Sequence, residues 1–309
     1  MQLIECERLT KKYGNKKVLD KLSLKIEAGG PIGVVGPNGA GKTTFFSVVA
    51  GFIKPSSGSV KILGKAVNSS ELKRKISILP QDALFPRSMA VLDTLVFFAR
   101  LQGYNREGAI QQAKEVLELV NLSESARSHP ETMSHGMKKR LSIAQALIGN
   151  PELVFLDEPT SGLDPATAAI IRNTITQRSK DATFLISSHN LEEIEDLCSG
   201  ILILKKGRLI KQDKMANVVS RTSMLTVVLE GVPPESLIAG LQSLEGILKV
   251  AVPSQSAKSV LIEVEEAHFN KAQMDIMGML LESGVPYREI KKGRSLEQQL
   301  VDIATNKNI

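Results

Sequence analysis

The stretch that decides the fold is Gly36-Pro37-Asn38-Gly39-Ala40-Gly41-Lys42-Thr43, which Thr44 follows. It fits the pattern G-x-x-x-x-G-K-T, in which a glycine-rich backbone can wrap around phosphate oxygens and point several N–H groups at them. The apolar run Ile32–Val35 before it predicts a strand, and Lys42–Ala50 after it predicts a helix. The N-terminus of such a helix favours an anion. The sequence therefore predicts a phosphate-binding loop between a strand and a helix.

Two residues at the end of this loop have distinct chemical roles. Lys42 is expected to reach the β- and γ-phosphates of a nucleotide, and the Thr43 hydroxyl is expected to hold Mg²⁺. A glycine-rich turn that binds nothing is the alternative, and the flanking strand and helix argue against it. The loop thus predicts a nucleoside triphosphate with its magnesium ion.

A pair of acidic residues follows a second apolar run. Leu153–Leu156 predicts a buried strand, and its carboxyl end carries Asp157 and Glu158. Ligands bind at this end of parallel strands, so we expect both carboxylates beside the phosphate loop. Asp157 suits Mg²⁺ binding, and Glu158 could act as a general base toward water. Taken alone, two acids after an apolar run more often mark a strand end, but the phosphate loop reverses that preference.

Composition sets limits on the class of protein. The 309 residues are 42% hydrophobic and 23% charged, which suits about two globular domains. No apolar run is long enough to span a membrane, and residues 1–5 lack the basic and then apolar blocks of a secretory signal. Only two cysteines, Cys6 and Cys198, argue against a disulfide scaffold and suit a reducing compartment. Aromatic residues are only 4%, without a basic stripe among them, so nucleic acid is not expected as a partner.

The pattern of charge and periodicity changes near residue 221. Residues 1–220 carry 30 Lys and Arg against 22 Asp and Glu, whereas residues 221–309 carry 9 against 11. The basic excess suits a polyanionic ligand or an acidic lipid surface, and equally a solvated surface. We expect residues 1–220 to form an α/β domain with a helical subdomain at about 85–150. Residues 221–309 have the β-α-β-β-α-β order of a small ferredoxin-like α+β domain, followed by an amphipathic helix at Ser295–Ala304.

An ordered set of further residues resembles the motifs of the ABC ATPase family. Gln81 follows a predicted strand, as the glutamine of the family's Q-loop does, and Met133–Met137 resembles the signature Leu-Ser-Gly-Gly-Gln. Ser161–Asp164 is similar to the D-loop, and His189 to the switch histidine. Tyr13 stands where the family stacks an aromatic ring on adenine. The resemblance covers about residues 2–220 and implies a P-loop cassette with a RecA-like core, an antiparallel β subdomain and a helical subdomain.

The resemblance also implies a role for each of these residues. Gln81 would contact Mg²⁺ or water and sense the γ-phosphate, and His189 would stabilise the charge that develops on it. Ser134 and Gly136 would cap the γ-phosphate of ATP bound by the opposite subunit, and Asp164 of the D-loop would be a nucleotide-binding residue. Alone, Gln81 is an ordinary loop amide, Tyr13 is more often a strand-face aromatic, and His189 is more often structural.

The signature departs from the family pattern at three positions. Met133, His135 and Met137 replace leucine, the first glycine and glutamine, while Ser134 and Gly136 are kept. A hydroxyl and glycine N–H groups at a helix N-terminus still provide anion-binding chemistry. This form is similar to that of ABC ATPases that serve drug, polysaccharide and small-molecule exporters, which often carry a small C-terminal domain.

The resemblance implies the ATP-hydrolysing subunit of an exporter of unknown substrate, with ATP and Mg²⁺ as cofactors. Its partners would be separate transmembrane permease subunits and a second copy of the chain in the ATP-bound state. It would be cytoplasmic and peripheral on the cytoplasmic face of the cell membrane. The alternative is a non-transport ABC ATPase with a regulatory or nucleic-acid-associated role. Ribosome-associated relatives carry two cassettes, chromosome-associated ones carry long heptads, and non-hydrolysing modules lose Glu158 or His189; none of these patterns occurs here.

Overall fold

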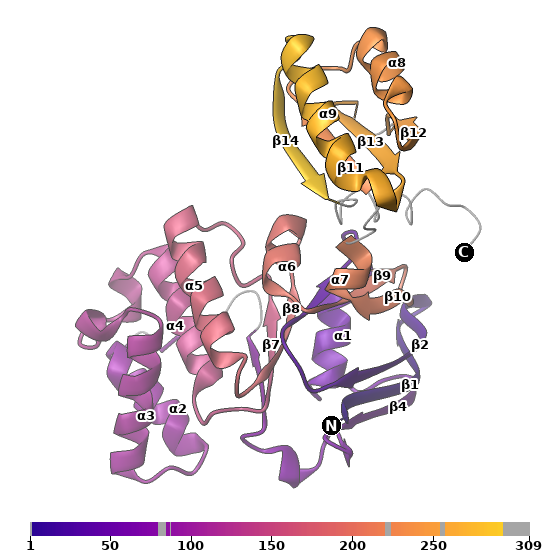
Figure 1. The fold of residues 1–309 in the computed structure, drawn as a ribbon. Helices are drawn as coiled ribbons and strands as arrows, with labels where there is room; N and C mark the ends of the chain where they lie inside the picture. The colour runs from indigo at the N-terminus through magenta and orange to yellow at the C-terminus, as the bar shows by residue number, and fades with distance from the viewer. Residues whose placement is uncertain (1, 80–84, 87, 220–223, 254–256, 293–309) are drawn as a thin grey trace. The chain divides into compact units, whose positions relative to one another are not determined.

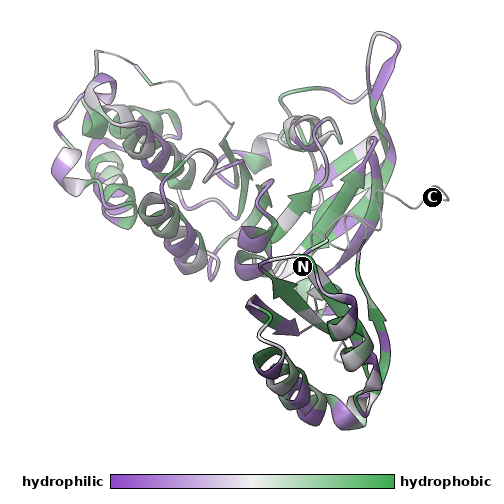
Figure 2. Cartoon of the chain, turned by 90° about the horizontal axis from the view of Figure 1, so that it is seen from above, coloured by the Kyte–Doolittle hydropathy of each residue, from purple (hydrophilic) through white to green (hydrophobic). Residues whose placement is uncertain are grey.

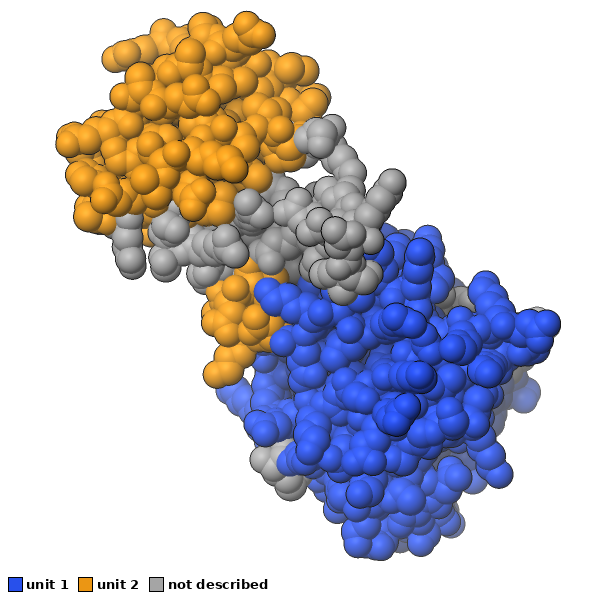
Figure 3. Space-filling view, turned by 90° about the vertical axis from the view of Figure 1, so that its right-hand side faces the viewer, with its two compact units in different colours: residues 1–212 blue, residues 213–309 orange. Residues whose placement is uncertain are grey.

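The computed structural model describes residues 2–79, 85, 86, 88–219, 224–253 and 257–292. The chain divides into two compact units, residues 1–212 and residues 213–309, coloured blue and orange in Figure 3. Each unit has a hydrophobic cluster of its own. The boundary expected near residue 221 falls at residues 220–223, outside the described residues.

A six-stranded sheet forms the centre of unit 1 (Figure 1). Parallel pairing joins its five strands from β9 to β6. Every residue of β7 and β8 is buried, as expected of parallel strands covered on both faces. The carboxyl ends of these strands therefore meet at one edge. The strands lie in the order β10 (Arg208–Lys214), β9 (Gly200–Lys205), β3 (Ile32–Val35), β8 (Thr183–Ser187), β7 (Leu153–Asp157) and β6 (Ile76–Leu79).

Three helices of unit 1 follow strands of this sheet. Helix α1 (Lys42–Val49) follows β3 through the phosphate loop, and α5 (Pro165–Arg178) follows β7. Helix α6 (Leu191–Leu197) follows β8, and the apolar pattern did not predict it. Its N-terminus is nonetheless marked in the sequence, because Asn190 caps it by accepting from the Glu193 N–H at 3.2 Å.

A second, antiparallel sheet lies in the order β2-β1-β4-β5. Apolar and polar residues alternate on either side of Gly14-Asn15, and these two stretches form its longest pair, β1 (Gln2–Tyr13) and β2 (Lys16–Glu27). Strand β4 (Ser57–Ile62) pairs with β1, and the short β5 (Lys65–Ala66) extends the sheet. One face of this sheet packs on the same hydrophobic cluster as α1, which fixes the position of the β1–β2 hairpin beside the phosphate loop.

Helices dominate the chain between β6 and β7. They are α2 (Val91–Leu101), α3 (Arg106–Leu119) and α4 (His135–Leu147). Asn105 and Ser134 cap α3 and α4 through their side chains, accepting from Gly108 N at 2.8 Å and from Met137 N at 3.2 Å. The helical character expected at about 85–150 is therefore present, and polar caps fix the N-termini of α3 and α4.

Unit 2 contains the β-α-β-β-α-β order expected from the sequence. Its sheet lies in the order β12-β13-β11-β14 with antiparallel pairing throughout, and α8 and α9 join the cluster on one face. The predicted helix at Ser295–Ala304 lies outside the described residues. The elements are α7 (Met215–Val219), β11 (Met224–Leu229), α8 (Glu235–Ser243), β12 (Ile247–Ala251), β13 (Ser259–Val264), α9 (Phe269–Glu282) and β14 (Tyr287–Lys292).

Hydropathy follows this architecture (Figure 2). The strands carry much of the hydrophobic colour, and the helices alternate hydrophobic and hydrophilic residues, as elements with one buried face do. Among the described residues, none of the helices combines the length and the apolar character that crossing a membrane requires.

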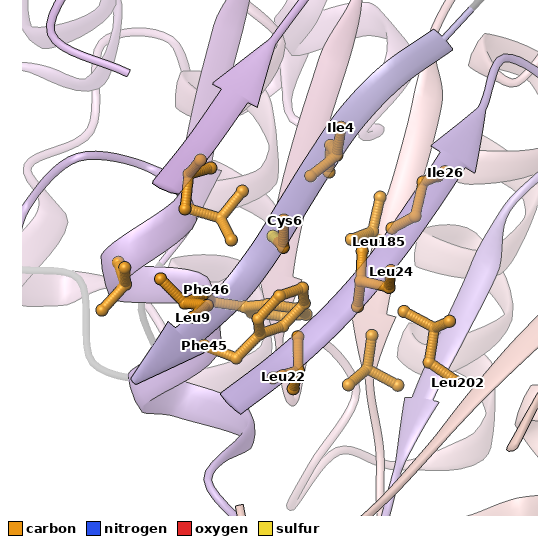
Figure 4. Packing of buried hydrophobic residues seen from close by; sticks show 14 of the residues in the cluster. Ile4, Cys6, Leu9, Leu22, Leu24, Ile26, Phe45, Phe46, Leu185 and Leu202 are labelled. Atoms are coloured by element: carbon orange, nitrogen blue, oxygen red, sulfur yellow. The ribbon is translucent and has the colours of Figure 1, made fainter. Parts of the chain in front are cut away.

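Phe46 of α1 lies at the centre of the unit 1 core (Figure 4). Its ring packs edge-on against Phe155 of β7 with centroids 5.5 Å apart. The core therefore connects the helix after the phosphate loop directly to the strand that ends at Asp157. Cys6 belongs to the same core, and burial raises the pKa of its thiol to about 12, so it stays protonated and unreactive.

We expect Phe46→Ala to lower the free energy of unfolding by about 3–5 kcal/mol, because it leaves a cavity in a packed core. Urea unfolding followed by circular dichroism measures the change. Phe52→Ala is the matched control, since the Phe52 side chain is 67% exposed and should shift stability by less than about 0.5 kcal/mol. Equal losses in the two variants would contradict the assigned core.

Candidate functional site

The phosphate loop forms one wall of a cleft of about 710 Å³ in unit 1. Residues far apart in the sequence meet there: the β1–β2 hairpin, the loop itself, the ends of β7 and β8, and the turn after β9. The structure thus brings the acidic pair and the phosphate loop into one site. The lining residues are Lys16, Lys17, Val18, Asn38, Gly39, Ala40, Gly41, Lys42, Thr43, Thr44, Asp157, Glu158, Ser161, His189 and Lys206.

The glycines of the loop have two different functions. A Cβ on Gly36 would lie 2.2 Å from the Leu204 carbonyl oxygen, and a Cβ on Gly41 would lie 2.8 Å from that of Val18. Gly41 also has a φ of +103°, which L side chains rarely adopt. A Cβ on Gly39 would meet no atom within 4 Å. Gly36 and Gly41 therefore let the loop pack closely on the protein, while Gly39 leaves the cleft side of the backbone open.

The turn between β9 and β10 supports the loop from behind. The Gly207 N–H donates to the Ala40 carbonyl at 3.0 Å, and the Asp20 N–H donates to the Gly207 carbonyl at 2.9 Å. The turn is therefore hydrogen bonded both to the phosphate loop and to β2. Local sequence pattern does not reveal this contact with the loop, because it depends on how the two sheets pack.

Positive charge surrounds the loop. Lys42 Nζ donates to the Gly36 carbonyl at 2.8 Å, so its side chain curls back over the loop. Lys16, Lys17 and Lys206 line the same cleft, and sequence reasoning had not singled them out. Four lysines against Asp157 and Glu158 give the cleft a surplus of positive charge, which suits a polyphosphate.

Asp157 is held at the end of β7 by the neighbouring strand. Its side chain is buried, and one carboxylate oxygen accepts a hydrogen bond from the Ser187 hydroxyl. The parallel register of β7 and β8 places these two residues directly opposite one another. Ser187 was missed as a site residue, although a serine that ends an apolar strand beside this acid is a recognisable signal.

The donors at this corner fit a magnesium ion. Mg²⁺ prefers oxygen ligands and is usually bound by one or two carboxylates together with substrate phosphates. Thr43 and Asp157 supply a hydroxyl and a carboxylate to the same cleft. The described residues contain no group of three His, Cys, Asp or Glu side chains that could hold a metal without help. A shared site, completed by phosphate oxygens, is therefore the arrangement that these residues support.

Glu158 and His189 form a pair at the edge of the cleft. Glu158 Oε2 lies 2.7 Å from His189 Nδ1, and the Glu158 side chain is 15% exposed against 68% for His189. Glu158 has a φ of +51°, an uncommon conformation for a residue with a side chain. Its N–H donates to both the carbonyl and the hydroxyl of Ser187 at 3.1 Å. The carboxylate is thereby held where it could accept a proton from water.

Six of the predicted site residues that the structure describes lie outside the lining of this cleft. Tyr13 is 48% exposed with Lys11 Nζ 5.1 Å from its ring centre. Ser134 caps α4, and Gly136 lies close to Thr167, since a Cβ there would be 3.1 Å from that side chain. Asp164 caps α5 by accepting from Thr167 N at 2.9 Å, and this backbone hydrogen bond lowers the pKa of the carboxyl. Gly36 and Pro37 belong to the loop but are not lining residues, and Gln81 lies outside the described residues.

Comparison with known proteins agrees with this geometry. Residues 19–161 match the model of the ABC transporter family. The linearmycin resistance ATP-binding protein of Bacillus subtilis is 33% identical over 282 residues, which are 89% of this chain and 89% of that protein. The bacitracin transport ATP-binding protein of Bacillus licheniformis is 38% identical over 214 residues, covering 68% of this chain and 69% of that protein.

A solved structure of a nucleotide-free ATP-binding cassette from an ABC transporter has a TM-score of 0.62 and 27% identity, covering 69% of this chain and 92% of that one. The fold, the cleft and the relatives thus agree, and the chain belongs to the family of ABC transporter ATP-binding subunits.

Proposed function

We propose that this chain hydrolyses ATP to drive export of a substrate through separate transmembrane subunits. One observation supports the hydrolytic part of this proposal: the phosphate loop and the Glu158–His189 pair face the same cleft. Within that pair, Glu158 Oε2 lies 2.7 Å from His189 Nδ1. A module that only holds Mg-ATP can use Asp157 but has no need of a second carboxylate beside its phosphate loop, whereas hydrolysis requires a group that orients water.

The chain's own residues would divide the reaction between them. The loop amides and Lys42 would bind the phosphates and hold the γ-phosphoryl group in place. Glu158 would accept a proton from the water that attacks phosphorus, as the bond to the bridging oxygen of ADP breaks. His189 would orient the carboxylate and stabilise developing negative charge. A Mg²⁺ ion held by Thr43 and Asp157 would neutralise phosphate charge.

Different observations support the export role and the dimer of two copies of this chain. The relatives named above are a resistance protein and a transport protein, and such subunits act with transmembrane partners. Ser134 and Gly136 lie at the N-terminus of α4, outside the cleft lining. That position suits a site completed by a second copy, in which these residues would approach the partner's nucleotide. Gln81 and Tyr13 keep their proposed contacts with γ-phosphate and adenine.

Glu158→Gln should lower kcat for ATP hydrolysis by about 10²- to 10⁴-fold, because the group that accepts the proton is removed. ATP affinity should change by less than about threefold, since the loop and Lys42 are intact. Phosphate release measures the first quantity and a fluorescent nucleotide titration the second. Glu124→Gln, at an exposed site, is the control. Unchanged turnover would exclude Glu158 as the base.

Lys42→Ala should act on binding instead. Loss of a charged hydrogen-bond donor to phosphate should weaken ATP binding by about 10- to 100-fold. The same titration checks this, with the exposed Lys54→Ala as control. ATP binding as tight as in the parent would contradict the assignment of the phosphate loop.

Residues 221–309 are proposed to dimerise or regulate, because the nucleotide cleft is lined by unit 1 residues alone. A chain that ends after residue 220 should still bind Mg-ATP. In the Glu158→Gln background it should form less ATP-dependent dimer than the full chain, as measured by analytical ultracentrifugation. If a folded, shortened chain lost nucleotide binding, this division of labour would be wrong.

A further inference from the structure

A buried carboxylate lies directly behind the Glu158–His189 pair. Glu193 of α6 is only 4% exposed, and its Oε2 accepts hydrogen bonds from two hydroxyls. Thr160 Oγ1 donates at 2.6 Å and Ser188 Oγ at 3.3 Å. Thr160 follows Glu158 by two residues, and Ser188 immediately precedes His189. One carboxylate oxygen therefore joins the two chain segments that carry the pair.

Capping of helix α6 does not account for the position of the Glu193 carboxylate. A glutamate at the third helical position usually reaches back to the N–H of the capping residue. Here that N–H, on Asn190, donates to the Ser188 hydroxyl at 3.0 Å instead. The Glu193 carboxylate thus does not cap its own helix, and it accepts a hydrogen bond from Thr160 in the loop after β7 instead.

A contribution to folding stability does not account for the buried Glu193 carboxylate either. Glu193 Oε1 has no hydrogen-bond partner within the described parts of the chain, and the nearest cation, Arg172 Nη1, is 4.0 Å away. Burying a carboxylate that is only partly paired is unfavourable, and apolar packing of similar volume is often at least as stable. A partly paired, buried carboxylate that bonds to both segments carrying the Glu158–His189 pair points to a role in the geometry of that pair.

We propose that Glu193 is a positioning residue for ATP hydrolysis, a role that rests on the function proposed above. By holding Thr160 and Ser188 on one oxygen, it ties the loop after Glu158 to the loop before His189. This tie keeps Glu158 Oε2 and His189 Nδ1 2.7 Å apart. Glu193 acts through these residues and is not among those that line the cleft.

The decisive variant is Glu193→Gln, with Glu192→Gln as its matched control. Both change a glutamate of α6 in the same way, but Glu192 is exposed. The amide oxygen of Glu193→Gln can still accept two hydrogen bonds, but it carries no negative charge, so the bonds from Thr160 and Ser188 become weaker and hold the two segments less firmly. We expect kcat to fall by about 10- to 100-fold, with KM for ATP within about threefold, because misalignment affects the chemical step. Glu192→Gln should match the parent in both constants.

The effect of Glu193→Gln in a chain that already lacks the His189 side chain distinguishes a positioning role from a general loss of structure. In a His189→Ala chain, Glu193→Gln should lower kcat by less than about threefold further, because the partner that it aligns is gone. A full additional 10- to 100-fold loss there would overturn the proposal. Thr160→Val removes one of the two bridging bonds and should lower kcat in the same direction; this variant decides the matter if Glu193→Gln does not fold in a thermal melt.

The geometry itself is measured without turnover. Crystal structures of the parent and of Glu193→Gln should show Glu158 Oε2 and His189 Nδ1 in contact in the parent and separated in the variant. An unchanged separation would overturn the proposal even if ATP hydrolysis were established. A parent that binds ATP but never hydrolyses it would instead contradict the proposed function, and the crystallographic comparison would still decide the positioning role.

Discussion

The pairing of β7 with β8 is the constraint on which the site depends. Its parallel register sets Asp157 opposite Ser187, so the hydroxyl of one strand holds the carboxylate of the other. The same serine also accepts a hydrogen bond from the N–H of Glu158, and this bond helps to hold Glu158 in its left-handed conformation. A shift of this register would displace both acids together, because two neighbouring residues depend on one partner on the adjacent strand.

The phosphate loop depends on close approach in a similar way. Gly36 and Gly41 allow the loop to contact the backbone at Leu204 and Val18, and Gly207 donates to the loop from the β9–β10 turn. Preorganised N–H groups are worth most when they need no rearrangement on binding. The antiparallel sheet therefore has a direct part in the site, because its β1–β2 hairpin both supports the phosphate loop and contributes lysines to the cleft.

Most strands and helices follow from local pattern. Buried parallel strands such as β7 and β8 read as continuous apolar runs, and the β1–β2 pair reads as alternation about Gly14-Asn15. Helix α6 was missed because its residues, Leu-Glu-Glu-Ile-Glu-Asp-Leu, are mostly acidic and its packing was not visible in the pattern. The phosphate loop, Asp157, Glu158 and His189 could be predicted because their motifs are local in sequence. Lys206 and Glu193 could not, because their positions arise from contacts between segments that only the folded chain brings together. Ser187 was missed although it ends an apolar run, which is a recognisable signal.

Two departures from ordinary local structure meet at the end of β7. Glu158 adopts a positive φ, and Glu193, just behind it, is a carboxylate buried with one oxygen unsatisfied among the described residues. Each is unfavourable for folding by itself. Their convergence on the Glu158–His189 pair is expected where geometry is selected at the expense of stability. Under the positioning role proposed for Glu193, the hydroxyls of Thr160 and Ser188 would contribute to the geometry of the cleft although they do not line it.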